Sequence, residues 1–262
     1  MGYRWGYHKW CLSIMYECTS AISPPVVNPA TANADHDVQV TTFDNGTYAT
    51  NTTAPEFAVT WNYTQGNPDQ PVHAFPNIMI NGTTLPVHVN SLNNITLDVD
   101  WTYGLGNEPV ATTDIKSLDT ASLNANVAVD MFLDSTQELS SDSEKAKYEI
   151  MVWLARFGTS TYPYGKQTSI TQTVNGVNSD LWSGTKTTTN QIVLTWVVPD
   201  GTTAQNFTGD LRTLLDRPTG IAEGEYPSAT DYLGHFSFGS EAYYIDTNVT
   251  FHVPNFAIDI RT

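Results

Sequence analysis

Apolar and polar residues alternate in short runs from about residue 37 to the end of the chain. Alternation with period 2 is typical of a β-strand that buries one face. Pairs such as Asn175-Gly176 and Asp200-Gly201 separate the runs and favour tight hairpin turns. The runs lie near residues 37–43, 56–63, 72–80, 95–102, 123–133, 147–157, 167–174, 191–198, 232–241 and 243–260. About ten strands with short connections predict an all-β, antiparallel sandwich.

One segment has helical spacing instead. Leu211, Leu214 and Leu215 fall on one side of a helix, and Pro218 stops that helix. Thr208 can cap the first turn, because a Thr hydroxyl accepts a hydrogen bond from a free backbone N–H. We expect one short α-helix here, packed on the outer, convex sheet and without a role in the chemistry.

The beginning of the chain differs from the rest. Residues 19–35 are rich in Pro, Ala, Ser and Asn, which is typical of an extended linker. Residues 1–20 carry polar groups throughout and lack the uninterrupted apolar stretch of a signal peptide. We expect an atypical N-terminal segment and linker over residues 1–35, with a wrong or truncated start, and one sandwich domain over residues 36–262.

Charge and hydropathy exclude two classes of partner. The net charge is −16, with 11 Lys and Arg against 27 Asp and Glu, so no basic stripe is available to bind nucleic acid. No apolar run approaches the ~18 residues that a membrane span needs. The two cysteines, Cys11 and Cys18, either close a small loop in an oxidising compartment or stay free.

Sequons for N-glycosylation recur along this Thr- and Asn-rich chain. A single Asn-x-Ser/Thr sequence means little, but many in one domain favour a secreted eukaryotic glycoprotein. We therefore expect an extracellular protein, and a monomer. The candidate glycosylation sites are Asn45, Asn51, Asn62, Asn81, Asn94, Asn206 and Asn248.

Two glutamates interrupt strands that otherwise look buried. The segment Tyr-Glu-Ile-Met-Val-Trp places Glu149, Met151 and Trp153 on one face. The strand that ends at Glu241 places His235 on the same face as that glutamate. A carboxylate is unfavourable in a protein core, since desolvating one without a partner costs several kcal/mol. Both faces should therefore be concave and partly wet.

A third acid follows the same pattern. Asn126 and Asp130 share one face of a strand whose other face is apolar. An isolated acid in a strand is more often a solvated residue of an outer face. Here, however, three acids lie within aromatic or aliphatic segments, and a common concave face explains them as well as solvated outer faces do. The pattern alone leaves both interpretations open. Two carboxyls and a tryptophan on one sheet face would suit glycoside cleavage.

Several ordered motifs resemble glycoside hydrolase family 12, the endo-β-1,4-glucanases and xyloglucan-specific glucanases. Tyr-Glu-Ile-Met-Val-Trp-Leu at residues 148–154 is similar to the family's nucleophile strand, and Phe-Gly-Ser-Glu at 238–241 is similar to its acid/base strand. The resemblance covers residues 56–262. Its further motifs are Asn-Val-Ala-Val-Asp-Met-Phe at 126–132, Val-His-Ala-Phe-Pro-Asn at 72–77 and Phe-Thr-Gly-Asp-Leu at 207–211.

The resemblance implies a fold and three roles. The fold would be a concanavalin-like β-jelly roll, with an open cleft across the concave one of two curved antiparallel sheets. Glu149 would be the nucleophile, Glu241 the general acid/base, and Asp130 the neighbour that tunes Glu149. A retaining mechanism needs the two carboxyls about 5–5.5 Å apart. Glu241 should then stay protonated to a higher pH than Glu149.

A second set of residues is expected to bind the sugar. Trp153 should stack near the cleavage point, rather than serve as a plain core tryptophan. Trp61 and Trp182 are either sugar platforms or buried residues, and His235 is a wall residue of the cleft rather than a catalyst. The predicted substrate-binding set is Trp153, Met151, Asn126, Trp61, Trp182 and His235. Neither a metal nor a cofactor is expected, since no His or Cys pair shows ligand spacing.

Two departures from the family pattern qualify the expected function. Residues 1–55 do not reproduce the family's first strand, which carries a sugar-stacking tryptophan. Ala242-Tyr243-Tyr244 follows Glu241, where the family usually has Pro or Ala and then Phe-Thr-Gly. We expect a secreted, endo-acting, retaining glycosidase that cleaves β-1,4-glucosidic bonds of cellulose, mixed-linkage glucan or xyloglucan. The alternative is a non-catalytic glucan-binding protein or inactive decoy on the same fold.

Overall fold

The computed structural model describes residues 13–17, 38–45, 52–65, 72–81 and 84–262. Strands make up most of these residues, as the alternating pattern predicts. They are β1 (Ser13–Glu17), β2 (Val38–Asn45), β3 (Thr52–Tyr63), β4 (Asn77–Asn81), β5 (Val87–His88), β6 (Asn94–Leu105), β7 (Asn124–Asp134), β8 (Tyr148–Phe157), β9 (Lys166–Val174), β10 (Val177–Thr185), β11 (Ile192–Val197), β12 (Asn206–Asp210), β13 (Tyr232–Gly239) and β14 (Ala242–Arg261).

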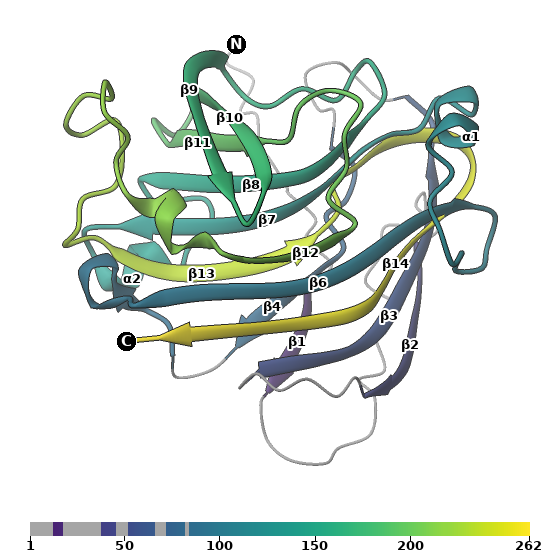
Figure 1. Cartoon of the computed structure of the whole chain (residues 1–262), viewed down its shortest axis with the longest axis horizontal. Coiled ribbons are helices and arrows are strands. Elements are labelled where there is room, and N and C mark those ends of the chain that lie inside the picture. The colour runs from purple at the N-terminus through teal and green to yellow at the C-terminus, as the bar shows by residue number, and fades with distance from the viewer. Residues whose placement is uncertain (1–12, 18–37, 46–51, 66–71, 82–83) are drawn as a thin grey trace, which may run out of the picture.

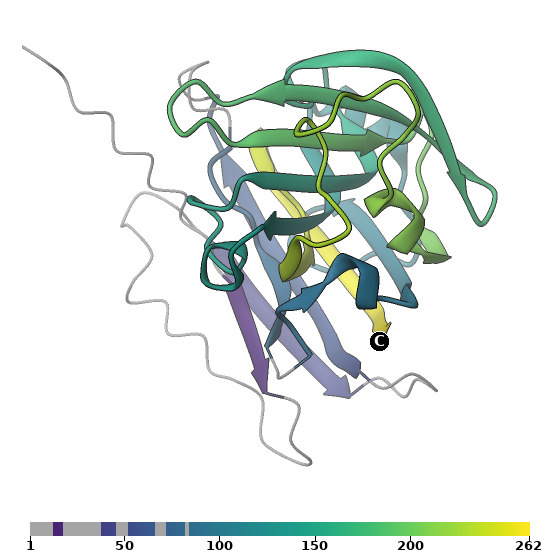
Figure 2. The same cartoon turned by 90° about the vertical axis from the view of Figure 1, so that its left-hand side faces the viewer.

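The strands form two layers. In the first sheet the order is β1-β4-β13-β7-β8-β11-β10-β9, and in the second it is β2-β3-β14-β6-β12. The long strand β14 joins them: Ala242 and Tyr244 pair with β7, and the rest of β14 lies between β3 and β6. Figures 1 and 2 show the layers packed against each other, with β14 in yellow. The predicted sandwich is confirmed, and the β8–β11 and β1–β4 pairs are parallel rather than antiparallel.

The main core fills the space between the sheets. In β6 every second residue is buried, from Ile95 through Leu97, Val99 and Trp101 to Tyr103. The facing side chains come from β7 and β8, whose residues on one side of each strand belong to the same cluster. The opposite side of β7 and β8 is the concave face, and it carries the candidate chemistry. This division follows directly from the period of 2.

Each of the ten predicted runs overlaps a strand, but the pattern misses others. β10 is the clearest case, because Asn178, Asp180, Ser183 and Gly184 hide its alternation. It pairs with β9 across the predicted Asn175-Gly176 turn, whose two residues have the positive φ angles of 47° and 81° that such a turn needs. β12, β5 and β1 are also absent from the prediction. β1 lies within the segment expected to be a separate N-terminal linker.

The predicted helix differs in type, cap and position. Leu211–Leu215 form a 3₁₀ helix, η3, and Thr208 belongs to strand β12. Asp210 is the cap: its Oδ1 accepts from the backbone N–H of Arg212 at 2.9 Å and of Ile95 at 2.8 Å. The carboxylate displaces the Thr hydroxyl as the cap because it satisfies two donors at once. The three leucines join the main core, between β6 and β9.

The described residues contain three further short helices that the sequence pattern does not predict. They are α1 (Ile115–Thr120), α2 (Gln137–Ser140) and the 3₁₀ helix η2 (Val89–Ser91). Each is too short to show a helical period in the sequence. None of the helices in the described part of the chain has the length and apolarity that crossing a bilayer requires.

The Asp210 cap gives a test of this local structure. Asp210→Ala should lower the free energy of unfolding by about 1–3 kcal/mol, because it leaves two backbone N–H groups without their acceptor. Asp210→Asn, which keeps a side-chain oxygen, should lose less. Thr208→Ala is the control, since its exposed hydroxyl donates only to Asp98 Oδ1. Denaturant unfolding measures all three, and a larger loss in Thr208→Ala than in Asp210→Ala would contradict this assignment.

Candidate active site

The strand register brings residues from five strands into one row across the concave face. Asp130 on β7 lies opposite Ser237 on β13 and Met151 on β8. Met151 lies beside Thr195 on β11, which in turn lies opposite Trp182 on β10. Residues directly opposite each other in a sheet project to the same side. The structure therefore brings Asp130, Met151 and Trp182 to one face, as the sequence predicts for the first two.

A small apolar cluster on this face is separate from the main core. It consists of Ala128, Met151, Trp153 and Val197, with Trp182 packed against it. Trp153 is thus not part of the core between the sheets. Its indole Nε1 is buried and has no hydrogen-bond partner among the described residues. A buried indole N–H normally finds an acceptor, so this donor is suited to a ligand hydroxyl.

Glu241 lies in the link between β13 and β14, where Asn126 holds it. The Asn126 side chain donates through Nδ2 to Glu241 Oε2, and its Oδ1 accepts from the Glu241 backbone N–H at 2.8 Å. The Tyr243 hydroxyl donates to the same Oε2 at 3.4 Å. The nitrogen and the oxygen of the Asn126 side-chain amide therefore both form hydrogen bonds with Glu241. This contact fits a residue that positions Glu241 better than the sugar-binding role expected from the sequence.

A chain of hydrogen bonds connects this clamp to the core. Ser240 Oγ donates to the Asn126 backbone carbonyl at 2.6 Å and lies 2.8 Å from the Tyr103 hydroxyl. That hydroxyl accepts from Trp61 Nε1 at 2.9 Å. Burial raises the pKa of Tyr103 above its ordinary value, so it stays a neutral member of the chain. Trp61 is itself packed in the main core and offers no face to a sugar, which does not support its expected role as a platform.

Glu149 meets a partner that the sequence analysis did not find. This glutamate, on β8, is 2% exposed, and the Lys186 ammonium forms an ion pair with its Oε2. Lys186 also donates to Gln191 Oε1 at 2.7 Å. Gln191 is anchored in turn, because its Nε2 donates to the backbone carbonyls of Ser143 at 3.0 Å and Ala146 at 2.9 Å. The only hint in the sequence is that lysine is rare in this chain.

Asp130 is a diagonal neighbour of Glu149. The register places Phe132 opposite Glu149 and Asp130 opposite Met151, two residues further along β8. Diagonal pairs of this kind have Cβ atoms about 7 Å apart. The Asp130 carboxyl is also buried. Two buried acids at this separation disfavour each other's ionised form, and the coupling expected from the sequence remains a prediction.

Tyr243 links the two glutamates electrostatically. Burial raises the pKa of its hydroxyl well above the ordinary value of 10, and the carboxylates of Glu241 and then Glu149 raise it further. Both carboxyls thus act on one phenol, so they lie in the same part of the concave face. The sequence marked Tyr243 as a departure from the family pattern but did not assign it to Glu241.

His235 occupies the expected position at the side of the site. It lies opposite Phe132 on β7, and its ring contacts the Phe132 ring edge to face with centroids 5.1 Å apart. Its Nε2 is 3.1 Å from Ser237 Oγ. Phe132 separates His235 from Glu149 in the register. This placement fits a wall residue.

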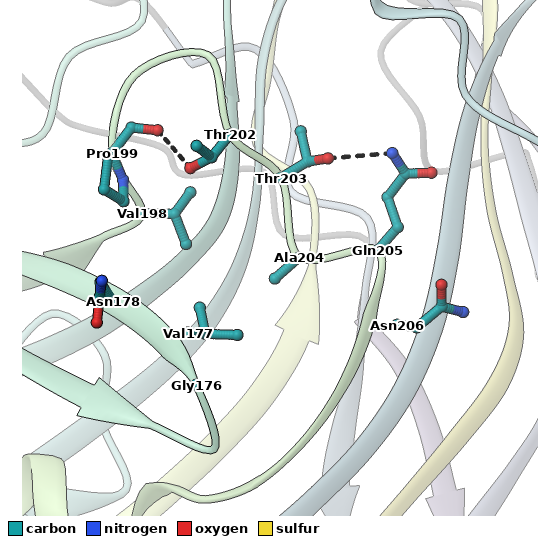
Figure 3. Close-up of a pocket in the computed structure, with 10 residues that line it drawn as sticks. All are labelled: Gly176, Val177, Asn178, Val198, Pro199, Thr202, Thr203, Ala204, Gln205 and Asn206. Atoms are coloured by element: carbon teal, nitrogen blue, oxygen red, sulfur yellow. Dashed lines mark hydrogen bonds between the residues drawn. The ribbon is translucent and has the colours of Figure 1, made fainter.

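A pocket elsewhere on the protein has a different character. It measures about 610 Å³ and lies between the β9–β10 turn and the segment from Val198 to Asn206. Figure 3 shows that its lining combines Val, Pro, Ala and Gly with amide and hydroxyl side chains. No carboxyl or aromatic ring lines it, so it lacks both the acid and the stacking surface that glycoside chemistry uses. The concave face is the better candidate.

The described residues contain no cluster of three or more His, Cys, Asp or Glu side chains arranged to hold a metal ion. Cys11, Cys18 and the sequon at Asn51 lie outside the described residues. Among the other sequons, Asn206 is exposed, whereas the Asn62 side chain donates to Asn248 Oδ1.

Comparison with known proteins identifies the family. The model of glycosyl hydrolase family 12 matches residues 30–261. The chain belongs to this family. A xyloglucan-specific endo-β-1,4-glucanase A of Aspergillus niger is 32% identical over 70% of this chain and 64% of its own length. Endoglucanase A of Aspergillus kawachii is 28% identical over 66% of this chain and 70% of its own length.

Solved structures of family 12 agree with the fold. The catalytic domain of Humicola grisea Cel12A, in complex with a thio cellotetraose, superposes with a TM-score of 0.63 at 25% identity, and the match covers 86% of each chain. Endoglucanase 3 of Trichoderma harzianum superposes with a TM-score of 0.62 at 21% identity, covering 88% of this chain and 100% of the other. The predicted jelly roll is thereby confirmed.

The environment of Tyr243 predicts how the protein titrates. Its raised pKa means that the folded state keeps the phenol neutral as the pH passes 10, so the stability it contributes is present below pH 10 and is lost only as the pH rises further. In a titration of tyrosinate absorbance, native wild type and Tyr243→Phe should therefore release the same number of phenolic protons up to about pH 11. One fewer titrating group near pH 10 in the variant would show that Tyr243 is not held in this way.

Proposed function

We propose that this family 12 protein is a secreted endo-acting glycosidase that cleaves internal β-1,4-glucosidic bonds of β-glucans with net retention. The observation that carries the proposal is the contrast between the two glutamates. Glu149 contacts an ammonium, whereas the donors on Glu241 Oε2 from Asn126 and Tyr243 are neutral. An ammonium stabilises the ionised form of a carboxyl through its positive charge, an interaction that neutral amide and hydroxyl donors lack. We therefore assign the proton of the resting site to Glu241 and the negative charge to Glu149.

This difference assigns the roles. Glu149 is the nucleophile, because it is ionised and can attack the anomeric carbon. Glu241 is the acid/base: it protonates the leaving oxygen in the first step and takes a proton from water in the second. Asn126 and Tyr243 fix the direction of the Glu241 carboxyl. Asp130 acts through Glu149, since each of these acids raises the cost of ionising the other.

The apolar cluster supplies the surface for the sugar. Trp153 and Met151 are almost fully buried on the Glu149 face of β8 and form the floor, and the half-buried Trp182 continues the surface toward β10. His235 forms the wall on the β13 side. An aromatic face covers a sugar ring well because its apolar body packs on the C–H groups while polar atoms at its edge meet hydroxyls. We assign these residues to substrate binding.

Tyr164 extends this surface beyond the residues named from the sequence. Its ring lies against the Cα of Gly184, on the side where a side chain at Gly184 would project. Gly184 aligns with Val193, which lies beside Glu149. Tyr164 is 43% exposed, so its ring is available to stack on a sugar two strands away from the nucleophile. Further subsites are what an endo-acting enzyme needs.

The relatives support a β-1,4-glucan as substrate. Their names include both an endoglucanase and a xyloglucan-specific glucanase, and the family is the same. Tyr243 and Tyr244, which follow Glu241, differ from the family pattern, and we propose that this wall decides whether branched chains fit. Comparing rates on carboxymethylcellulose, mixed-linkage glucan and xyloglucan distinguishes among these substrates. Secretion is supported by the sequons, of which Asn206 is exposed.

The two glutamates should respond differently to substitution. Glu149→Gln and Glu241→Gln should each lower the rate on β-glucan by a factor of about 10²–10⁴ or more. On an aryl cellobioside with a good leaving group, Glu241→Gln should still release the phenol in one turnover, because that group needs no protonation. Glu149→Gln should not. Identical behaviour of the two variants in a single-turnover assay would contradict the assigned roles.

The stereochemistry tests the mechanism as a whole. Proton NMR of fresh products should show the β-anomer first, with the α-anomer growing in only by mutarotation. An α-anomer at the earliest time would exclude the double displacement. Tight binding of cello-oligosaccharides with no reducing sugar released after long incubation would instead favour the alternative of a non-catalytic glucan-binding protein.

A further inference from the structure

The ion pair on Glu149 is built by the loop that connects β10 to β11. Lys186 is the first residue of this loop and Gln191 the last. The backbone N–H of Lys186 donates to the Gln191 carbonyl at 2.8 Å, and the N–H of Asn190 donates to the Lys186 carbonyl at 2.8 Å. Asn190 has a φ of 59°, a left-handed conformation that Asn tolerates better than most residues. The loop therefore closes tightly on itself.

Two further contacts fix the direction of the lysine. Gln191 is buried, and its amide N–H groups are held by the carbonyls of Ser143 and Ala146, so its oxygen has a defined place. Lys186 Nζ donates to that oxygen and to Glu149 Oε2. The Lys186 side chain is 27% exposed, which is less than a surface lysine would be. The ammonium is thus positioned by the loop rather than drawn to Glu149 from solvent.

The groups around Glu149 are mostly acidic, so the Lys186 ammonium has a large effect on its charge. Asp130 on β7 is a diagonal neighbour, and Glu241, just before β14, and Tyr243, in β14, face the same part of the concave face. His235 on β13 lies behind Phe132. The acids all disfavour a negative charge on Glu149, whereas Lys186 favours it. A buried carboxylate is costly without such a partner.

We propose that Lys186 is a positioning residue that favours the second chemical step, hydrolysis of the glycosyl-enzyme, over the first. This inference rests on the proposed role of Glu149 as nucleophile. In the first step a Glu149 oxygen forms a bond to the anomeric carbon, the glycosidic bond breaks, and the proton of Glu241 goes to the leaving oxygen. Glu149 becomes a neutral ester, and Lys186 loses the anion beside it.

The second step reverses this loss. Water attacks the anomeric carbon and gives a proton to Glu241, the bond to Glu149 breaks, and its electron pair returns to the carboxylate. That carboxylate forms beside the Lys186 ammonium, which stabilises it. A contact with an ammonium makes a carboxylate a weaker nucleophile but a better leaving group. Lys186 therefore slows formation of the intermediate and speeds its breakdown.

The test uses substitutions that separate charge from shape. Lys186→Met removes the charge at similar length, Lys186→Gln keeps hydrogen-bond donors without charge, and Lys186→Arg restores the charge. Lys116→Met, on the exposed surface of α1, removes the same charge elsewhere and is the control. The substrate is a dinitrophenyl cellobioside, on which formation of the intermediate needs no proton and breakdown limits turnover. Melting temperatures accompany every variant.

On this substrate Lys186→Met and Lys186→Gln should lower kcat by about 10- to 100-fold, the effect expected for a hydrogen bond to a charged group. KM should fall with kcat, and the burst of one dinitrophenol per enzyme should be followed by a slow phase that is about 10- to 100-fold slower than that of wild type. Mass spectrometry of the quenched protein should show the glycosyl-enzyme. The acid limb of the pH profile for kcat/KM should move to higher pH, because Glu149 becomes easier to protonate. Lys186→Arg should recover kcat, and Lys116→Met should resemble wild type.

The controls separate this inference from the function on which it rests. No product from wild type, or an undiminished rate in Glu149→Gln, would overturn the proposed function and the role of Lys186 with it. Wild-type turnover through Glu149, combined with a wild-type kcat and KM in both Lys186→Met and Lys186→Gln, would overturn the role of Lys186 alone. A kcat that falls only in proportion to a lost folded fraction, with KM unchanged, would do the same.

Discussion

Carboxyl groups buried on one face of a sheet are the constraint on which the rest of this structure depends. The strands β7 and β8 are buried on both sides: one side faces the core between the sheets, and the other carries Asp130 and Glu149. An acid in such a place is stable only if charged or hydrogen-bonding partners compensate for lost water. The protein provides a different partner for each glutamate. Lys186 meets Glu149, and Asn126 and Tyr243 meet Glu241.

These partners are themselves held by the fold. Asn126 is fixed by the series of hydrogen bonds that runs through Ser240 and Tyr103 to Trp61 in the core. Lys186 is fixed by Gln191 and by the tight loop between β10 and β11. The orientation of Glu241 is therefore set through hydrogen bonds that reach the core, and that of Glu149 through the loop between β10 and β11. This arrangement preorganises the two carboxyls before a substrate arrives, which is how a site lowers the cost of reaching the transition state.

The surface for the substrate follows from the same register. Cross-strand pairing aligns Met151, Thr195 and Trp182 in one row, and the small apolar cluster around Trp153 lies beside them. Because the cluster is separate from the main core, its side chains can contact a ligand without disturbing the packing between the sheets. The loop residue Tyr164 lies over Gly184, where the absence of a side chain leaves room for its ring. Sheet geometry thus sets both the chemistry and the binding surface.

Most strands, the residues that share a side with each acid, and the family could be predicted from the sequence. A period of 2 is local, so Glu149, Met151 and Trp153 had to share a side of β8 wherever that strand lay in the sheet. The sequence did not determine which residues meet across strands. Lys186 lies 37 residues from Glu149, and Asn126 lies 115 residues from Glu241. The sequence could not show whether Trp61 is a core residue or a sugar platform. It also could not show whether Asp210 or Thr208 caps η3. Each outcome depends on neighbours that are distant in the chain. Only strand order and register decide such contacts, because they bring remote segments within hydrogen-bonding distance, and no local pattern encodes that proximity.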